Sequence, residues 1–208
     1  MGNNEMKVLT LDTETTGLPL WDKESSDPGQ PRVVEVAAVL DDHEGKNRHV
    51  FNAIVKPISF TIPAEASNIH GIRHEMAMDL GLAPKTVFEI ICDMLRNADR
   101  LVCHNTRFDV KLLKVEAHNL QMPELRTLAE NIDHHCTMMT TTALCKIPKA
   151  TGYGNKWPTL AELTKFLFNE DLQNAHSALV DTKACRRAYQ ELCRRNVPTS
   201  IVYNKKAG

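Results

Sequence analysis

The stretch from Val8 to Gly17, with the sequence VLTLDTETTG, constrains this chain more than any other feature. It predicts a strand, and the alternation of side chains along a strand places Asp12 and Glu14 on one face at its end. Neighbouring carboxylates repel each other and need a compensating cation. Mg²⁺ and Mn²⁺ prefer carboxylate oxygens. The stretch therefore favours a metal site over a strand end whose acids are simply solvated.

Composition indicates an ordinary globular protein. Of the 208 residues, 42% are hydrophobic and 25% are charged, which suits a single domain spanning 1–208, with a short tail after about residue 195. Apolar runs stay well below the roughly 20 residues that cross a bilayer, and the polar start lacks the core of a secretory signal. We therefore expect a cytoplasmic protein with no membrane contact. A formal net charge of -1 neither supports nor excludes a polyanionic substrate.

The order of apolar runs predicts an α/β fold. A strand over 32–40 and a strand over 50–55 should form a hairpin meander with the first strand. Helical spacing of apolar residues follows, with a short strand at 101–103 between helices and a strand and short helix within 136–144. The predicted helices cover 62–78 with a break at Gly71, 84–98, a segment that carries Leu112 and Leu120, 160–168 with a capping box from Thr159 to Glu162, and 177–195.

Two predicted helices each place an aspartate on the face that should be apolar. Asp109 precedes Leu112 and Leu113 by three and four residues, and Asp181 has the same relation to apolar residues of the last helix. Together with the two acids of the first strand they make four carboxylates that can converge. Two cations about 3.5 to 4 Å apart can clamp a scissile phosphodiester. A dinuclear metal site for phosphodiester hydrolysis is therefore the leading hypothesis.

A histidine near this cluster would suit the proton transfer that hydrolysis requires. His176 lies just before the last helix, five residues ahead of Asp181, and histidine is the side chain that exchanges protons near neutral pH. His134 and His135 are adjacent on one strand, so they point to opposite faces and do not suggest a metal cluster. Glu35, inside an apolar run, either supports the acidic cluster or reaches solvent. The sequence leaves both readings open.

Three motifs carry a resemblance to a known family. DTETTGL at Asp12 to Leu18, HNxxFD at His104 to Asp109 and HxAxxD at His176 to Asp181 resemble, in order and spacing, the three motifs of the DEDDh 3′–5′ exonuclease family. The resemblance spans nearly the whole chain. His176, followed by serine rather than tyrosine, points to the DEDDh branch.

The resemblance implies a ribonuclease H-like fold, with a central mixed five-stranded sheet flanked by helices. It also implies that Asp12, Glu14, Asp109 and Asp181 hold two Mg²⁺ or Mn²⁺ ions and that His176 is the general base. The substrate would be the 3′ end of a single-stranded nucleic acid, DNA rather than RNA, and the product a nucleoside 5′-monophosphate. A polymerase is a possible partner in proofreading or repair. Family similarity further assigns substrate contacts to Thr15, Leu18, Glu65 and His70.

Two other functions fit parts of the sequence. A ribonuclease of the same family would trim RNA or short oligoribonucleotides. A non-catalytic accessory subunit that binds nucleic acid would show a lost acid or a lost histidine, and none is lost here. The loop 146–157 carries lysines and aromatic residues that suit phosphates and stacked bases, but a surface loop without a ligand fits its composition equally well.

Overall fold

The computed structural model describes residues 6–42 and 48–198. Most of the predicted turn after the second strand and most of the predicted tail lie outside the described residues. None of the helices in the described ranges has both the length and the apolar character needed to cross a bilayer.

Five strands form one mixed sheet in the order β3-β2-β1-β4-β5. β1 is antiparallel to β2 and β2 to β3, whereas β4 is parallel to β1 and β5 to β4. This arrangement confirms the predicted meander and the predicted mixed five-stranded sheet. The strands are β1 (Val8–Thr15), β2 (Val33–Asp41), β3 (His49–Ile54), β4 (Arg100–Cys103) and β5 (Asp133–Cys136).

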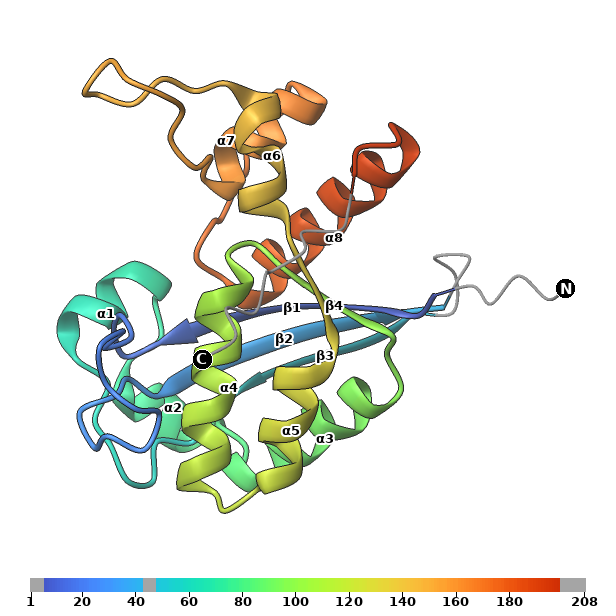
Figure 1. Cartoon of the computed structure of the whole chain (residues 1–208). Coiled ribbons are helices and arrows are strands. Elements are labelled where there is room, and N and C mark those ends of the chain that lie inside the picture. Colours follow the sequence, from blue (N-terminus) through green and yellow to red (C-terminus); the bar gives the residue numbers. More distant parts are fainter. Residues whose placement is uncertain (1–5, 43–47, 199–208) are drawn as a thin grey trace, which may run out of the picture.

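Helices cover both faces of the sheet (Figure 1). On one face, Leu9 and Leu11 of β1 belong to a buried core shared with α3, α4 and α5. On the other, Val8 and Val102 pack with Cys185 and Tyr189 of α8. The helices in the described ranges are α1 (Ala64–His70), α2 (His74–Leu80), α3 (Pro84–Arg96), α4 (Thr106–Asn119), α5 (Pro123–Asn131), α6 (Thr137–Cys145), α7 (Leu160–Phe168) and α8 (Ala178–Arg194).

Local sequence explains most of the helix boundaries. Gly71 ends α1 with a φ of 77°, a conformation that glycine adopts at low cost, so the predicted break divides 62–78 into two helices. At α7, the Thr159 hydroxyl accepts from the Glu162 N–H at 3.2 Å and the Glu162 carboxylate accepts from the Thr159 N–H at 2.8 Å. The predicted capping box is therefore confirmed.

Two elements differ from the sequence-based prediction. β5 occupies Asp133–Cys136, so it ends where the prediction had it begin. α5 was not predicted; Pro123 stands at its first turn, and only Leu125 and Ala129 of its residues are buried. Leu125, Leu128 and Ala129 have helical spacing over a single turn only, and a pattern this short does not distinguish a helix from a loop.

Candidate active site

The two acids of β1 share the sheet face covered by α8. Leu9 and Leu11 point into the opposite core, and alternation turns Asp12 and Glu14 the other way. The ladder between β1 and β2 is irregular between Glu14 and Thr15, where the strand ends. Both acids thus lie at the end of β1, just before the loop that leads to β2.

Asp181 and His176 reach the same place from the start of α8. The backbone N–H of His176 donates to Asp181 Oδ2 at 3.0 Å, and His176 has a φ of 70°. A residue other than glycine rarely adopts this φ, and such conformations concentrate at functional sites. Glu14, His176 and Asp181 each offer a ligand atom within 4.8 Å of the others. The structure therefore brings these three predicted residues together.

Asp109 approaches from α4, on the other side of β1. Its side chain is 2% exposed, and its Oδ1 accepts from the Thr13 hydroxyl at 2.9 Å. Asp12 and Asp109 lie outside the tight group of Glu14, His176 and Asp181 that the described residues form. Their negative charges nevertheless act on each other strongly enough to shift the pKa of Asp12.

Burial raises the pKa values of all four acids, and repulsion from the other acids adds to this for Asp12 and Glu14. Burial is the largest cause for Asp12, whose pKa rises well above its usual value, followed by the charges of Asp109, Asp181 and Glu14. Burial and Asp181 raise the pKa of Glu14 to about 7. Burial raises the pKa of Asp109 to about 7 against the opposing hydrogen bond from Thr13. Burial also raises the pKa of Asp181, against the His176 N–H.

The donor atoms fit divalent cations. Asp181 Oδ1 is buried and has no hydrogen-bond partner among the described residues, although a buried carboxylate oxygen normally has one. A cation at this oxygen would satisfy it and would favour the ionised form of the carboxylates, whose pKa values burial raises. Carboxylate oxygens are the ligands that Mg²⁺ and Mn²⁺ prefer. The residues present therefore suit such ions.

Glu35 supports the cluster instead of reaching solvent. It lies directly opposite Glu14 in the ladder between β1 and β2, is 7% exposed, and accepts from the Ala178 N–H at 3.0 Å. A carboxylate at a helix N-terminus satisfies an otherwise unpaired N–H and is favoured by the helix dipole. Glu35 thereby ties the start of α8, with His176 and Asp181, to the sheet. Its charge also raises the pKa of Glu14.

His104 fixes the start of the second motif. Its Nδ1 lies 2.9 Å from the Thr137 hydroxyl and its Nε2 lies 3.0 Å from the Pro158 carbonyl. Burial lowers its pKa to about 4, against the smaller effect of the Pro158 carbonyl. Asn105, which follows it, has a φ of 83° at the N-cap of α4. This turn directs α4 so that Asp109 faces Thr13.

The pKa of His104 predicts a loss of stability in acid. The unfolded state takes up its proton near pH 6.5 and the folded state near pH 4, so stability is full above the first value and falls as pH drops between them. At pH 5 the loss is about 2 kcal/mol, or roughly 4 to 8 °C in Tm. His104→Asn should therefore lose less Tm than the wild type between pH 7.5 and pH 5, measured by circular dichroism.

The control for this prediction is His118→Asn, because His118 is exposed near the end of α4. This variant should follow the wild-type acid profile. A His104→Asn profile parallel to that of the wild type would show that protonation of His104 does not cause the loss of stability in acid.

The four predicted substrate contacts lie near or beyond the end of β1. The Thr15 hydroxyl donates to the Gly17 carbonyl at 2.7 Å, and Leu18 is 80% exposed. On α1, Glu65 is exposed, and His70 Nδ1 accepts from the Ile72 N–H at 3.1 Å. Figure 1 shows α1 beside the end of β1. The roles of these four residues stay predictions.

His70 faces the end of β1. Burial lowers its pKa, and the backbone of Thr15 lies near enough to oppose that shift. Its Nε2 makes no hydrogen bond of good geometry with a described residue. Nε2 is therefore a polar atom at the edge of the site without a hydrogen-bond partner among the described residues.

The loop 146–157 combines ordered turns with exposed aromatic side chains. Lys156 is paired with Glu162 at 2.6 Å, and Pro148 and Asn155 form a backbone bridge. Tyr153 is 90% exposed and Trp157 63%. These contacts order the loop, but both readings of its function remain open.

Comparison with known proteins places this chain in a family. The family model described as Exonuclease (RNase_T) matches residues 9–189. DNA polymerase III subunit epsilon of Buchnera aphidicola subsp. Acyrthosiphon pisum is 30% identical over 193 residues, which cover 89% of this chain and 72% of that protein. The corresponding subunit of Rickettsia conorii is 28% identical, and the match covers 91% of this chain and 74% of that subunit.

Solved structures show the same fold. E. coli exonuclease I in complex with a dT13 oligonucleotide superposes with a TM-score of 0.70 at 19% identity, over 92% of this chain and 42% of that one. The nuclease domain of 3′hExo, described as a DEDDh family member bound to rAMP, superposes with a TM-score of 0.67 at 14% identity. The superposition covers 97% of this chain and 98% of that domain. The chain belongs to the DEDDh 3′–5′ exonuclease family and has its ribonuclease H-like fold.

Proposed function

We propose that this protein is a metal-dependent exonuclease that hydrolyses phosphodiester bonds at the 3′ ends of single-stranded DNA and releases nucleoside 5′-monophosphates. The observation that carries the proposal is the convergence of Glu14, His176 and Asp181 within 4.8 Å, beside Asp12 and Asp109, whose charges act on each other. A group of acids with an adjacent histidine at one strand end supplies what phosphodiester hydrolysis needs.

Asp12, Glu14, Asp109 and Asp181 would hold two Mg²⁺ or Mn²⁺ ions. When bound, these ions would neutralise charge on the scissile phosphodiester and favour ionisation of the attacking water. Hydrogen bonds hold two of these carboxylates in place. Thr13 fixes one oxygen of Asp109, and the His176 N–H fixes one oxygen of Asp181.

His176 would accept the proton of the attacking water. Its side chain is exposed and lies on the segment before α8, while its backbone N–H is held by Asp181. The backbone is thus fixed and the ring can reach solvent. Thr15, Leu18, Glu65 and His70 would contact the terminal nucleotide, with His70 Nε2 offering an unpaired polar atom.

The choice of DNA rests on the relatives. The two relatives described above are epsilon subunits of DNA polymerase III, and exonuclease I was solved with dT13. The names of the two subunits support a polymerase partner, and we infer from such a partner a role in proofreading or repair in the cytoplasm. A ribonuclease is the second candidate, because the 3′hExo nuclease domain, which this chain covers almost fully, was solved with rAMP.

Digestion of matched DNA and RNA 15-mers tests the proposal. Each single strand carries a label at its 3′ or its 5′ end and is incubated with Mg²⁺, with Mn²⁺ or with EDTA. We expect immediate release of the 3′ label as a mononucleotide, gradual shortening of the 5′-labelled strand, and no reaction in EDTA. Faster digestion of RNA would replace DNA by RNA in the proposal. Release of the 5′ label first, or activity in EDTA, would refute it.

A further inference from the structure

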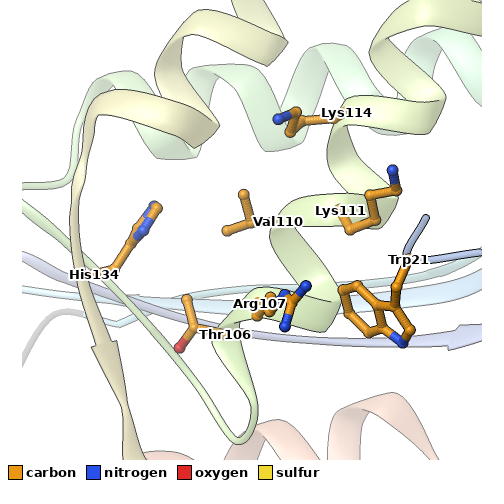
Figure 2. A pocket seen from close by; sticks show the side chains of 7 residues that line it. All are labelled: Trp21, Thr106, Arg107, Val110, Lys111, Lys114 and His134. Carbon is orange, nitrogen blue, oxygen red and sulfur yellow. The ribbon is translucent and has the colours of Figure 1, made fainter. Parts of the chain in front are cut away.

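A recess lies on the outer side of α4, away from the acidic cluster. It has a volume of about 320 Å³ and is formed by the loop after β1, α4 and β5. Figure 2 shows Trp21 and His134 on opposite sides, with Arg107, Lys111 and Lys114 along the helix between them. A recess of this size can hold a nucleotide-sized ligand. We call it the α4 pocket.

The three cations form one stripe of α4. Lys111 follows Arg107 by four residues and Lys114 by seven, so all three side chains share a face of the helix. Asp109, two residues after Arg107, points about 200° away at 3.6 residues per turn. α4 therefore presents a carboxylate to the acidic cluster and positive charge to the opposite side.

Two of these cations have no carboxylate partner in the described part of the chain. Lys114 is paired with Glu130 at 2.6 Å. The Lys111 ammonium instead donates to the Lys23 carbonyl at 2.6 Å, and the Arg107 guanidinium lies over the Trp21 ring, 4.5 Å from its centroid. Neutral partners leave the positive charge of Lys111 and Arg107 uncompensated. An anionic ligand would compensate it.

The aromatic ring gives the anion a chemical class. Trp21 is 44% exposed, and because Arg107 covers one face of its indole, the remaining surface can take a further planar group. Cations that follow a backbone, combined with an aromatic ring for a base, are the usual means of binding single-stranded nucleic acid. An acidic peptide would use the cations but would leave the ring without a role.

The loop after β1 connects the pocket to the predicted contacts of the terminal nucleotide. Trp21 is three residues after Leu18, one of those predicted contacts, and three residues span at most roughly 11 Å. A strand whose 3′ end occupies the cluster could therefore pass the pocket a few nucleotides upstream. We propose that the α4 pocket binds an internal segment of the single-stranded substrate, by its phosphates and one base. This proposal rests on the function proposed above.

Salt dependence of binding tests the phosphate contacts without requiring hydrolysis. Binding of a fluorescein-labelled dT15 is measured by anisotropy in EDTA over a series of NaCl concentrations. The slope of log K against log salt is negative, and each lost phosphate contact reduces its magnitude by about 0.7 for a single strand. R107A/K111A should therefore make the slope less negative by about 1.4. The matched control K85A/K165A removes two charges from other helices and should keep the wild-type slope.

Fluorescence of Trp21 tests the base contact. The chain has two tryptophans, so Trp157→Phe leaves Trp21 as the sole reporter, and its emission should be quenched by dT15. Hexaglutamate should not quench it. Trp21→Ala should weaken dT15 binding about tenfold, the usual effect of losing one stacked base.

Kinetics separate failure of this proposal from failure of the proposed function. In Mg²⁺, R107A/K111A should lose at least fivefold more kcat/KM on dT15 than on a thymidine dinucleotide, which is too short to reach the pocket. Equal losses on both substrates, or a wild-type salt slope, would overturn the pocket while leaving the exonuclease intact. No binding of dT15 by the wild type would also overturn it. A wild type that binds dT15 through the pocket but hydrolyses neither substrate would overturn the exonuclease alone.

Discussion

Asp12→Asn is expected to reduce hydrolysis of a single-stranded DNA 15-mer at least about a thousandfold. Asparagine keeps the size of aspartate but removes the negative charge that would hold a cation. Metal ions contribute several kcal/mol to stabilising the transition state, and each 1.36 kcal/mol corresponds to a factor of ten in rate. Release of mononucleotides in saturating Mg²⁺, compared with the wild type at equal concentration, measures the effect.

Thermal unfolding in EDTA shows whether this variant is folded. Burial and neighbouring acids raise the pKa of Asp12 in the folded protein, so the wild type loses stability as pH rises above the unfolded value. Asparagine cannot ionise and escapes this loss. At pH 8 the variant should therefore unfold at a temperature equal to or above that of the wild type. A folded variant with more than a tenth of wild-type activity would remove Asp12 from the metal site.

The sequence predicts those strands whose burial is visible in their own residues. β2 is buried along its whole length, and its continuous apolar run indicates this directly. β5 has the sequence DHHC, and its burial depends on residues that are distant in the sequence. His135 is fully buried because Tyr189 of α8 packs against its ring at 4.9 Å between centroids. The sequence around β5 does not indicate this contact between His135 and Tyr189.

The sequence predicts the acids of the candidate site because each of them interrupts or ends an apolar pattern. Asp109 and Asp181 interrupt apolar stripes of helices, and Asp12 and Glu14 end an apolar strand. Spacing could not show from which side each acid arrives, and Asp109 comes from the face opposite α8 to bond Thr13. It also left Glu35 undecided, because its partner, the Ala178 N–H, is 143 residues away. The α4 pocket was missed although its cations have helical spacing, since Trp21 comes from a distant loop.

Replacement of His176 by asparagine should lower kcat by roughly 10²- to 10⁴-fold, the usual cost of losing a general base. Asparagine tolerates the positive φ of this position better than most residues, and the backbone N–H to Asp181 is kept, so the change removes the ring while sparing the scaffold. Binding of dT15 should stay within a factor of three. Added imidazole should restore part of the rate.

Rescue by imidazole distinguishes proton transfer from a positioning role, because a small base in solution can accept a proton but cannot restore the geometry of α8. The rescued rate should rise with pH as imidazole loses its proton near neutrality. His118→Asn, on the exposed end of α4, should leave kcat at the wild-type value and show no response to imidazole. Unchanged turnover of the His176→Asn variant in saturating Mg²⁺ would show that the attacking water loses its proton by another route.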